Sequence, residues 1–296
     1  MRDMKCYVTK LQSSVNNDEL PVFGKLRLSV NIPQGYSYSE SSYIRFDTDV
    51  ADKPVKLSII GNGFFKASKD NGVTKDVYST NDGKFLNLNF PHEIIPSPGN
   101  YIIEIESKYN LKYVILSINT GVDCFIAPIS GGEVTCLSNA QLLILTNITT
   151  PNIYLANLCE GTQKVTNLNI LGTSIDGDLS ELNKYPLLQV AALGDEIKGD
   201  VSSLNECCSA LKTITVGKNI TGDIDALVVK CLAANPSLAA FNANTNGKVR
   251  VGGSTDMREY TVTYTITSTA IKLTSSNGVV QIATYDRASK KWDYES

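Results

Sequence analysis

A motif of eleven residues recurs three times in the middle of the chain, and it constrains the fold more than any other feature of the sequence. Its pattern is G-x-x-I-x-G-D-[L/V/I]-x-x-L, and the second glycines of successive copies are 22 and then 23 residues apart. Because a unit of this length buries apolar side chains on one side only, neighbouring units must stack around a shared core. The copies span residues 172–182, 194–204 and 217–227, and a degenerate earlier copy ends at residues 155–158.

Each fixed position of the motif has an expected role. An apolar strand precedes the first glycine, and the isoleucine of every copy is expected to point into the core: Ile175, Ile197 and Ile220. The second glycine permits a tight turn or a positive φ. The aspartate after it stands where a helix N-cap belongs, at Asp178, Asp200 and Asp223.

Two further signals concern the ends of the helical segments. Asp178 and Glu181 form the D-x-x-E pattern of a capping box. The third copy continues through a longer helical stretch, which Asn235-Pro236 is expected to break. We interpret the third copy as the capping unit that closes the stack.

The residues on either side of the repeat are expected to be β-structure. Alternating strands are predicted at residues 25–30, 43–46, 55–60, 84–90, 101–106 and 113–118, separated by turn dipeptides such as Asn62-Gly63. Short strands at this spacing favour a β-sandwich over residues 1–130. After the repeat, residues 260–267 alternate apolar residues with threonine, Asn277-Gly278 predicts a hairpin turn, and residues 291–294 predict a last edge strand. This small meander, residues 253–296, is too small to be stable alone and should pack on the repeat or on another chain.

The repeat resembles leucine-rich repeats of the kind written GD[I/V]SSL, which residues 199–204 match almost letter for letter. Such repeats are found in proteins of gut Bacteroidales and in virion proteins of the phages that infect them, including crAss-like phages. The opening residues 4–11 are also similar to the start of such phage proteins. The resemblance implies a leucine-rich-repeat-like solenoid over residues 131–252. The expected fold class is therefore α+β, mainly β: an N-terminal β-sandwich, a short solenoid and a small C-terminal β-meander.

Composition and charge argue against several classes of partner. A net charge of −3 does not indicate the excess of positive charge that would attract nucleic acid or an anionic membrane. No apolar run is long enough for a membrane span. The first residues lack the apolar segment of a signal peptide, so a chain that starts natively at Met1 is expected to be made in a cytoplasm. The cysteines show no C-x-x-C pattern and are expected to be reduced, mostly buried thiols: Cys6, Cys124, Cys136, Cys159, Cys207, Cys208 and Cys231.

The sequence offers little for catalysis or metal binding. His92 is the only histidine, so a serine or cysteine nucleophile lacks an evident base and a zinc site lacks ligands. Asp178, Asp200 and Asp223 are candidates for glycosidase carboxylates or calcium ligands, but their periodicity favours one structural role repeated in each unit. We therefore predict no catalytic, cofactor-binding or metal-ligating residue and no enzyme activity.

Aromatic residues near both ends could contact a ligand. Sugar stacking or a protein hot spot is one interpretation, and cross-strand packing within the domain is the favoured one. The residues are Tyr36, Tyr38, Tyr43, Tyr285, Trp292 and Tyr294.

The modular order and the resemblance predict a structural protein of a bacteriophage virion, a head-fibre, tail-fibre or decoration subunit made in the host cytoplasm. Its expected partners are other capsid or tail proteins, copies of itself, and a host-surface glycan or receptor. The alternative is a bacterial cell-surface adhesin or glycan-binding protein that lacks its signal peptide. A third hypothesis is an appendage that degrades polysaccharide.

Overall fold

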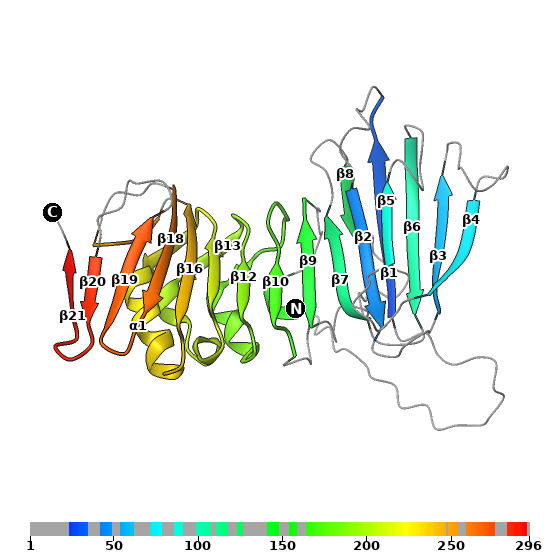
Figure 1. Ribbon diagram of the computed structural model, residues 1–296. Helices are drawn as coiled ribbons and strands as arrows, with labels where there is room; N and C mark the ends of the chain where they lie inside the picture. The colour runs from blue at the N-terminus through cyan, green and yellow to red at the C-terminus, as the bar shows by residue number, and fades with distance from the viewer. Residues whose placement is uncertain are drawn as a thin grey trace, which may run out of the picture.

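The computed structural model (Figure 1) describes residues 24–34, 42–48, 54–61, 72–78, 86–90, 99–107, 111–117, 123–126, 141–147, 154–158, 164–246, 248–253, 259–275 and 283–294. These residues are mainly β, with sheets of five, twelve and four strands and a minority of short helical segments. The prediction of a mainly β fold with some helix is therefore confirmed. Within the described residues no helix is both long and apolar enough to span a bilayer.

The N-terminal strands contribute to two of these sheets. An antiparallel sheet has the order β4-β3-β6-β1-β8, formed by β1 Gly24–Ile32, β3 Pro54–Gly61, β4 Gly72–Tyr78, β6 Gly99–Ser107 and β8 Asp123–Ile126. The twelve-stranded sheet begins with β5 Leu86–Phe90, β2 Ser42–Thr48 and β7 Leu111–Ser117. Strands are present at all six expected places. The pattern did not predict β4, where Lys75 interrupts the apolar alternation, or β8, which is only four residues long.

From β7 onward the twelve-stranded sheet passes directly into the repeat region. β7 pairs in parallel with β9, and parallel pairing continues through one strand of each unit. The residue ranges 1–130 and 131–252 thus share one sheet. The parallel strands are β9 Leu142–Thr146, β10 Asn167–Asn169, β12 Val190–Ala192, β14 Thr213–Val216 and β16 Ala240–Asn246.

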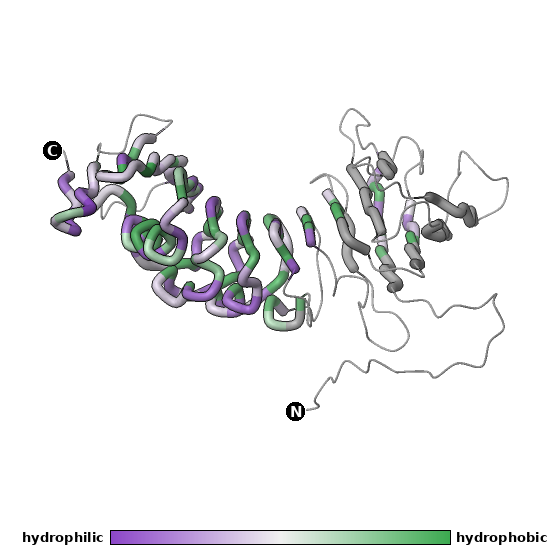
Figure 2. The backbone as a smooth tube through the Cα atoms, turned by 60° about the horizontal axis from the view of Figure 1, so that its bottom comes forward, coloured by the Kyte–Doolittle hydropathy of each residue, from purple (hydrophilic) through white to green (hydrophobic). Residues whose placement is uncertain are grey.

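A second, four-stranded parallel sheet lies on another side of the repeat units. Its strands are β11 Gly177–Asp178, β13 Ile197–Asp200, β15 Ile220–Asp223 and β17 Val249–Arg250. Helical segments follow three of these strands: the 3₁₀ helix η3 Leu179–Lys184 after β11, the 3₁₀ helices η4 Val201–Ser203 and η5 Glu206–Ser209 after β13, and the α-helix α1 Ile224–Ala234 after β15. A further 3₁₀ helix, η2 Leu155–Asn157, precedes β11. Each unit is one turn of a coil, and Figure 2 shows the turns stacked side by side.

The isoleucines of the motif, and the second glycines of its last two copies, have the expected roles. Ile175, Ile197 and Ile220 are no more than 1% exposed, so the prediction that they point into the core is confirmed. Gly199 and Gly222 have φ values of +129° and +108°, a region that favours glycine.

The expectation that the third copy closes the stack is wrong. After α1, which ends at the expected Asn235 cap, β16 and β17 form one further turn of the coil over residues 240–251. The stack ends where β18 pairs with β16 in the antiparallel direction. The further turn escaped detection because Val249 and Arg250 occupy the positions of Gly222 and Asp223, so the glycine–aspartate signature is lost.

The C-terminal meander extends the same twelve-stranded sheet. Its strands are antiparallel, and the last of them is the predicted edge strand: β18 Glu259–Ile266, β19 Ala270–Ser275, β20 Ala283–Asp286 and β21 Lys291–Tyr294. Tyr260, Val262 and Tyr264 of β18 are buried in the core that the repeat units also line. The predicted Asn277-Gly278 turn lies outside the described residues.

Candidate functional site

The repeated aspartates cap the helical segments. The carboxylates accept hydrogen bonds from backbone N–H groups: Asp178 from Ser180 (2.8 Å), Asp200 from Ser202 (2.8 Å) and Asp223 from Ala226 (3.1 Å). The capping prediction is confirmed. The expected capping-box partner, Glu181, forms an ion pair with Lys184 instead.

These hydrogen bonds also set the charge of the caps. The side-chain and backbone donors of Ser180 lower the pKa of Asp178, and the backbone N–H of Ser202 lowers the pKa of Asp200. Both carboxyls therefore stay ionised well below neutral pH.

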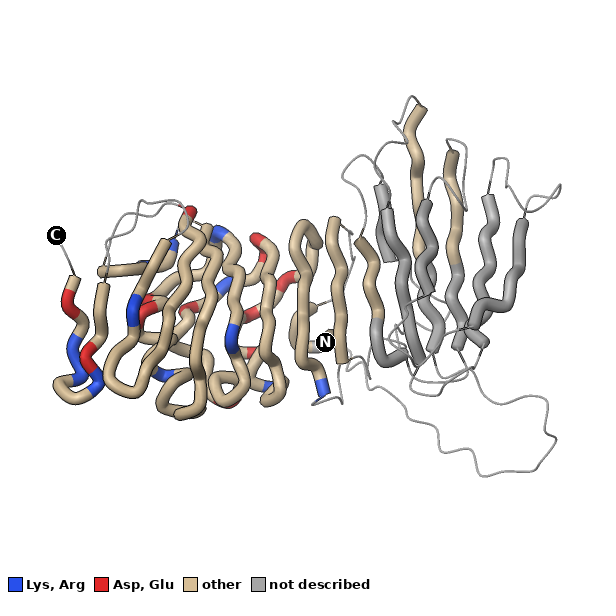
Figure 3. The backbone as a smooth tube through the Cα atoms, in the orientation of Figure 1, with Lys and Arg blue, Asp and Glu red and all other residues tan. Residues whose placement is uncertain are grey.

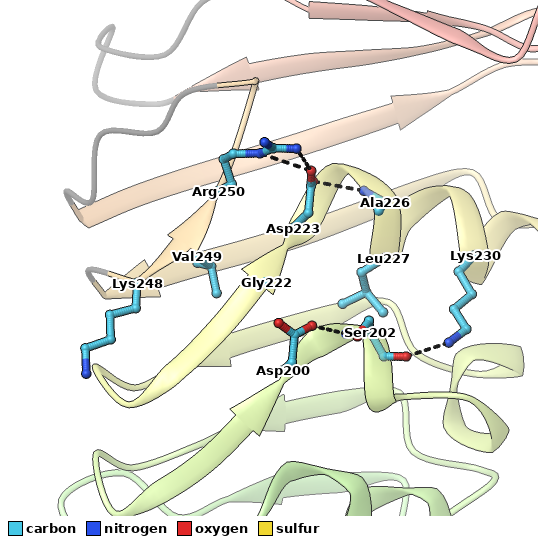
Figure 4. A pocket seen from close by; sticks show the side chains of 10 residues that line it. All are labelled: Asp200, Ser202, Gly222, Asp223, Ala226, Leu227, Lys230, Lys248, Val249 and Arg250. Carbon is cyan, nitrogen blue, oxygen red and sulfur yellow. Dashed lines mark hydrogen bonds and ion pairs between the residues drawn. The ribbon is translucent and has the colours of Figure 1, made fainter.

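A charged groove of about 510 Å³ lies over the four-stranded sheet near the end of the stack (Figure 4). It contains two of the caps and three cationic side chains: Lys230 of α1, Lys248 just before β17, and Arg250 of β17. We call it the charged groove. It is lined by Asp200, Ser202, Gly222, Asp223, Ala226, Leu227, Lys230, Lys248, Val249 and Arg250.

The charges of the groove are already engaged within the fold. Both Nε and Nη2 of Arg250 contact the same carboxylate oxygen of Asp223. Lys230 donates to the carbonyl of Ser202 (2.9 Å), one turn of the coil earlier. A retaining or inverting glycosidase needs one carboxyl with a raised pKa as proton donor. The ionised Asp200 does not meet that need, and Asp223 is paired with Arg250.

Asp225 is the residue that the sequence analysis missed. It is 1% exposed, and each carboxylate oxygen accepts two hydrogen bonds. Oδ1 accepts from Gly252 N (3.1 Å) and the Tyr264 hydroxyl (2.8 Å), and Oδ2 from Gly253 N (3.0 Å) and the Tyr294 hydroxyl (3.2 Å). Burial raises the pKa of Asp225, and the hydrogen bonds from Tyr264, Gly252 and Gly253 partly offset this effect.

The Asp225 contacts join the meander to the repeat stack. One carboxylate connects α1, the turn after β17, β18 and β21. One sequence signal was available: the third copy has Asp225 where the first two copies have Ser180 and Ser202.

The C-terminal aromatics pack against one another beside this carboxylate. The ring of Trp292 lies 5.3 Å from Tyr285, 6.0 Å from Tyr294 and 6.3 Å from Tyr264, measured between ring centroids. The interpretation of Tyr285, Trp292 and Tyr294 as packing residues is confirmed. Tyr36, Tyr38 and the side chain of Tyr43 lie outside the described part of the chain, as does His92.

Three cysteines form a buried group. Cys207, Cys208 and Cys231 are free and no more than 1% exposed, as expected for reduced thiols in a core. Hydrogen bonding to Cys208 and burial raise the pKa of Cys207 and Cys231. The side chains of the other four cysteines lie outside the described residues. Among the residues that the structure does describe, no group of three His, Cys, Asp or Glu side chains could hold a metal ion.

Comparison with known proteins gives no relative: no family model, no curated protein and no solved structure matches this chain.

Proposed function

We propose that this chain is a structural subunit of a bacteriophage virion, a head-fibre, tail-fibre or decoration protein that acts by binding other proteins and the host surface. The observation that carries the proposal is the twelve-stranded sheet, which runs without a break from β5 to β21 (Figure 1). An elongated body with one continuous sheet holds its two ends at a fixed separation. That property suits an appendage that is anchored at one end and binds at the other.

In this proposal the chain has three functional segments. Residues 1–130 form a β-sandwich that attaches to the particle, residues 131–252 a leucine-rich-repeat-like solenoid, and residues 253–296 a meander for assembly or binding. The five-stranded sheet beside the first strands of the long sheet supports the sandwich. Parallel ladders between units 23 to 29 residues apart support the solenoid.

Polar contacts between successive turns support a rigid spacer. Ion pairs connect Lys198 to Asp176 (3.4 Å), Lys218 to Asp195 (3.0 Å) and Arg250 to Asp223. Each exposed pair contributes little by itself. Together with the buried core and two ladders of backbone hydrogen bonds, they resist bending of one turn against the next.

Electron microscopy of phage particles labelled with antibodies against the purified chain tests the proposal. We expect label at one fixed place on the head or the tail. Label confined to the surface of uninfected bacteria would instead establish the adhesin alternative, which the uncharged repeat strands of the long sheet favour. Release of reducing sugar from capsular polysaccharide by the purified chain would contradict a purely structural role.

A further inference from the structure

The repeat strands of the long sheet contain no charged residue. This holds for all of β9, β10, β12, β14 and β16. Each strand of the four-stranded sheet, by contrast, includes at least one charged residue. In Figure 3 the strands of the long sheet in the repeat region are accordingly tan. The two outer faces of the coil therefore differ in chemistry, and only the long sheet presents a neutral one.

The outward positions near the end of the stack form a regular polar grid. Strand register places Asn242 between Thr213 and Thr263, and Asn244 between Thr215 and Thr261. The grid thus has two rows of three, with strands about 4.8 Å apart and rows about 7 Å apart. We call these six residues the Asn/Thr patch: Thr213, Thr215, Asn242, Asn244, Thr261 and Thr263.

Hydrogen bonds between neighbouring strands orient the two asparagine side chains: the amide of Asn242 accepts one, and the amide of Asn244 donates one. The Thr263 hydroxyl donates to Oδ1 of Asn242 (2.9 Å), and Nδ2 of Asn244 donates to the Thr215 hydroxyl (3.3 Å). Asn242 therefore keeps its amide NH₂ as a donor, and Asn244 keeps its amide oxygen as an acceptor. Both asparagines are exposed. The patch offers a neutral donor and a neutral acceptor whose directions are set before any ligand arrives.

A hollow of about 400 Å³ adjoins one row of the patch. Thr215 and Asn244 line it together with the turns that follow β10, β12 and β14. Glycine lets these turns approach one another closely: a Cβ on Gly217 would lie 2.5 Å from the carbonyl oxygen of Gly194. The charged residues lining it are Asp195, Glu196 and Lys218, so its rim has one more negative than positive charge.

We propose that the Asn/Thr patch and the adjoining hollow form a binding site for a neutral polysaccharide. This inference rests on the proposed host-surface role and names the class of receptor. Sugar hydroxyls both donate and accept hydrogen bonds, so they can pair with the oriented amide and hydroxyl groups of the patch. Such pairing does not require a charged group to lose its water. The acidic rim of the hollow disfavours anionic polymers. A protein partner is less favoured, because the patch has none of the Trp, Tyr or Arg anchors typical of protein hot spots.

Affinity electrophoresis of the purified full-length chain tests the site, with dextran, mannan, galactomannan and xyloglucan as neutral probes and alginate as the anionic one. We expect at least one neutral probe to retard the chain and alginate to have no effect. A double variant, Asn242→Ala with Asn244→Ala, should weaken the binding roughly tenfold or more, because it removes both preset groups. Thr269→Ala, an exposed change in the β18–β19 turn, is the matched control and should bind like the wild type.

A second variant separates lost binding from lost folding. Thr215→Arg keeps the strand but places a charged side chain over the patch, and it should abolish retardation while the melting temperature stays near that of the wild type. Binding should also persist between about 0.05 and 1 M NaCl, since neutral contacts are not screened.

Three results would overturn the proposal: retardation by alginate alone, retardation by none of the probes, or unchanged binding by the double variant. None of them bears on where the protein sits on a particle. The labelling experiment can therefore succeed or fail independently.

Discussion

At the scale of single residues, the carboxylate of Asp225 holds the end of the molecule together. Its four donors come from residues 27, 28, 39 and 69 positions away in the sequence. An uncompensated carboxylate this deeply buried would be strongly destabilising, and here every lone-pair direction is used. The meander is therefore fastened to the repeat stack by a specific polar contact as well as by the apolar core.

Asp225→Ala should lower the free energy of unfolding by about 2–4 kcal/mol, because it leaves two backbone N–H groups and the buried Tyr264 hydroxyl without an acceptor. Urea unfolding followed by circular dichroism measures the loss. Leu187→Ala, a change at a side chain that is 51% exposed, is the control and should alter stability by less than about 0.5 kcal/mol. Equal stability of the Asp225 variant and the wild type would show that the carboxylate does not hold the meander.

Asp200→Ala should lower stability by about 1 kcal/mol at neutral pH, the usual effect of losing an N-cap, whereas Asp200→Ser should retain most of the cap. The pKa of Asp200 is lowered in the folded state, so its contribution is present above its ordinary value of 3.8 and is lost as the pH falls through the lower folded pKa. Denaturant unfolding at pH 7 and below pH 3 checks this. A difference between variant and wild type that persists in acid would contradict the capping account.

Asp225 should show the opposite dependence on pH. Burial raises its folded pKa above the unfolded one, so its contribution is most favourable below the unfolded pKa and is lost as the pH rises through the folded pKa. Asp225 lies two positions after the cap Asp223, and its burial distinguishes it from Asp200, which is itself an exposed cap.

At the scale of elements, the stack depends on one isoleucine per turn. Ile197 is fully buried between neighbouring units, so Ile197→Ala should lower stability by about 2–5 kcal/mol through lost burial and a cavity, and Ile197→Val by about 0.5–1.5 kcal/mol. Thermal unfolding of the three proteins checks the order. If Ile197→Ala melts with the wild type, the units do not share a core at this position.

The sequence predicted the elements whose signals are local. A cap aspartate and its N–H donor lie two or three residues apart, and an alternating strand carries its own pattern, as in residues 260–267. The four-stranded sheet was not predicted, because its strands are two to four residues long and pair only with the next turn of the coil. The role of Asp225 was not predicted for the same physical reason, because all four of its hydrogen-bond donors are far from it in the sequence.

At the scale of the whole molecule, the long sheet leaves an edge at β21 that can pair with another chain (Figure 1). Unpaired backbone groups along an edge strand are a ready surface for association unless they are covered. Of the four residues of β21, Lys291 and Asp293 are exposed on either side of Trp292. An antiparallel pair of β21 strands from two copies, centred on Trp292, would place Lys291 of each copy opposite Asp293 of the other. Such an interface is self-complementary, as a two-fold dimer requires.

We therefore expect the chain to form dimers through β21, and charge exchange at these two positions tests that arrangement. Lys291→Asp places carboxylates opposite each other, and Asp293→Lys places ammonium groups opposite each other, so each single variant should weaken the dimer by several-fold. The double variant, with both changes, restores opposite charges and should recover the wild-type association. Light scattering over a range of concentrations measures the dissociation constants, and circular dichroism checks that these exposed changes leave the fold intact. If the single variants associate like the wild type, or the double variant fails to recover, the copies do not meet at this edge and assembly must use the N-terminal segment.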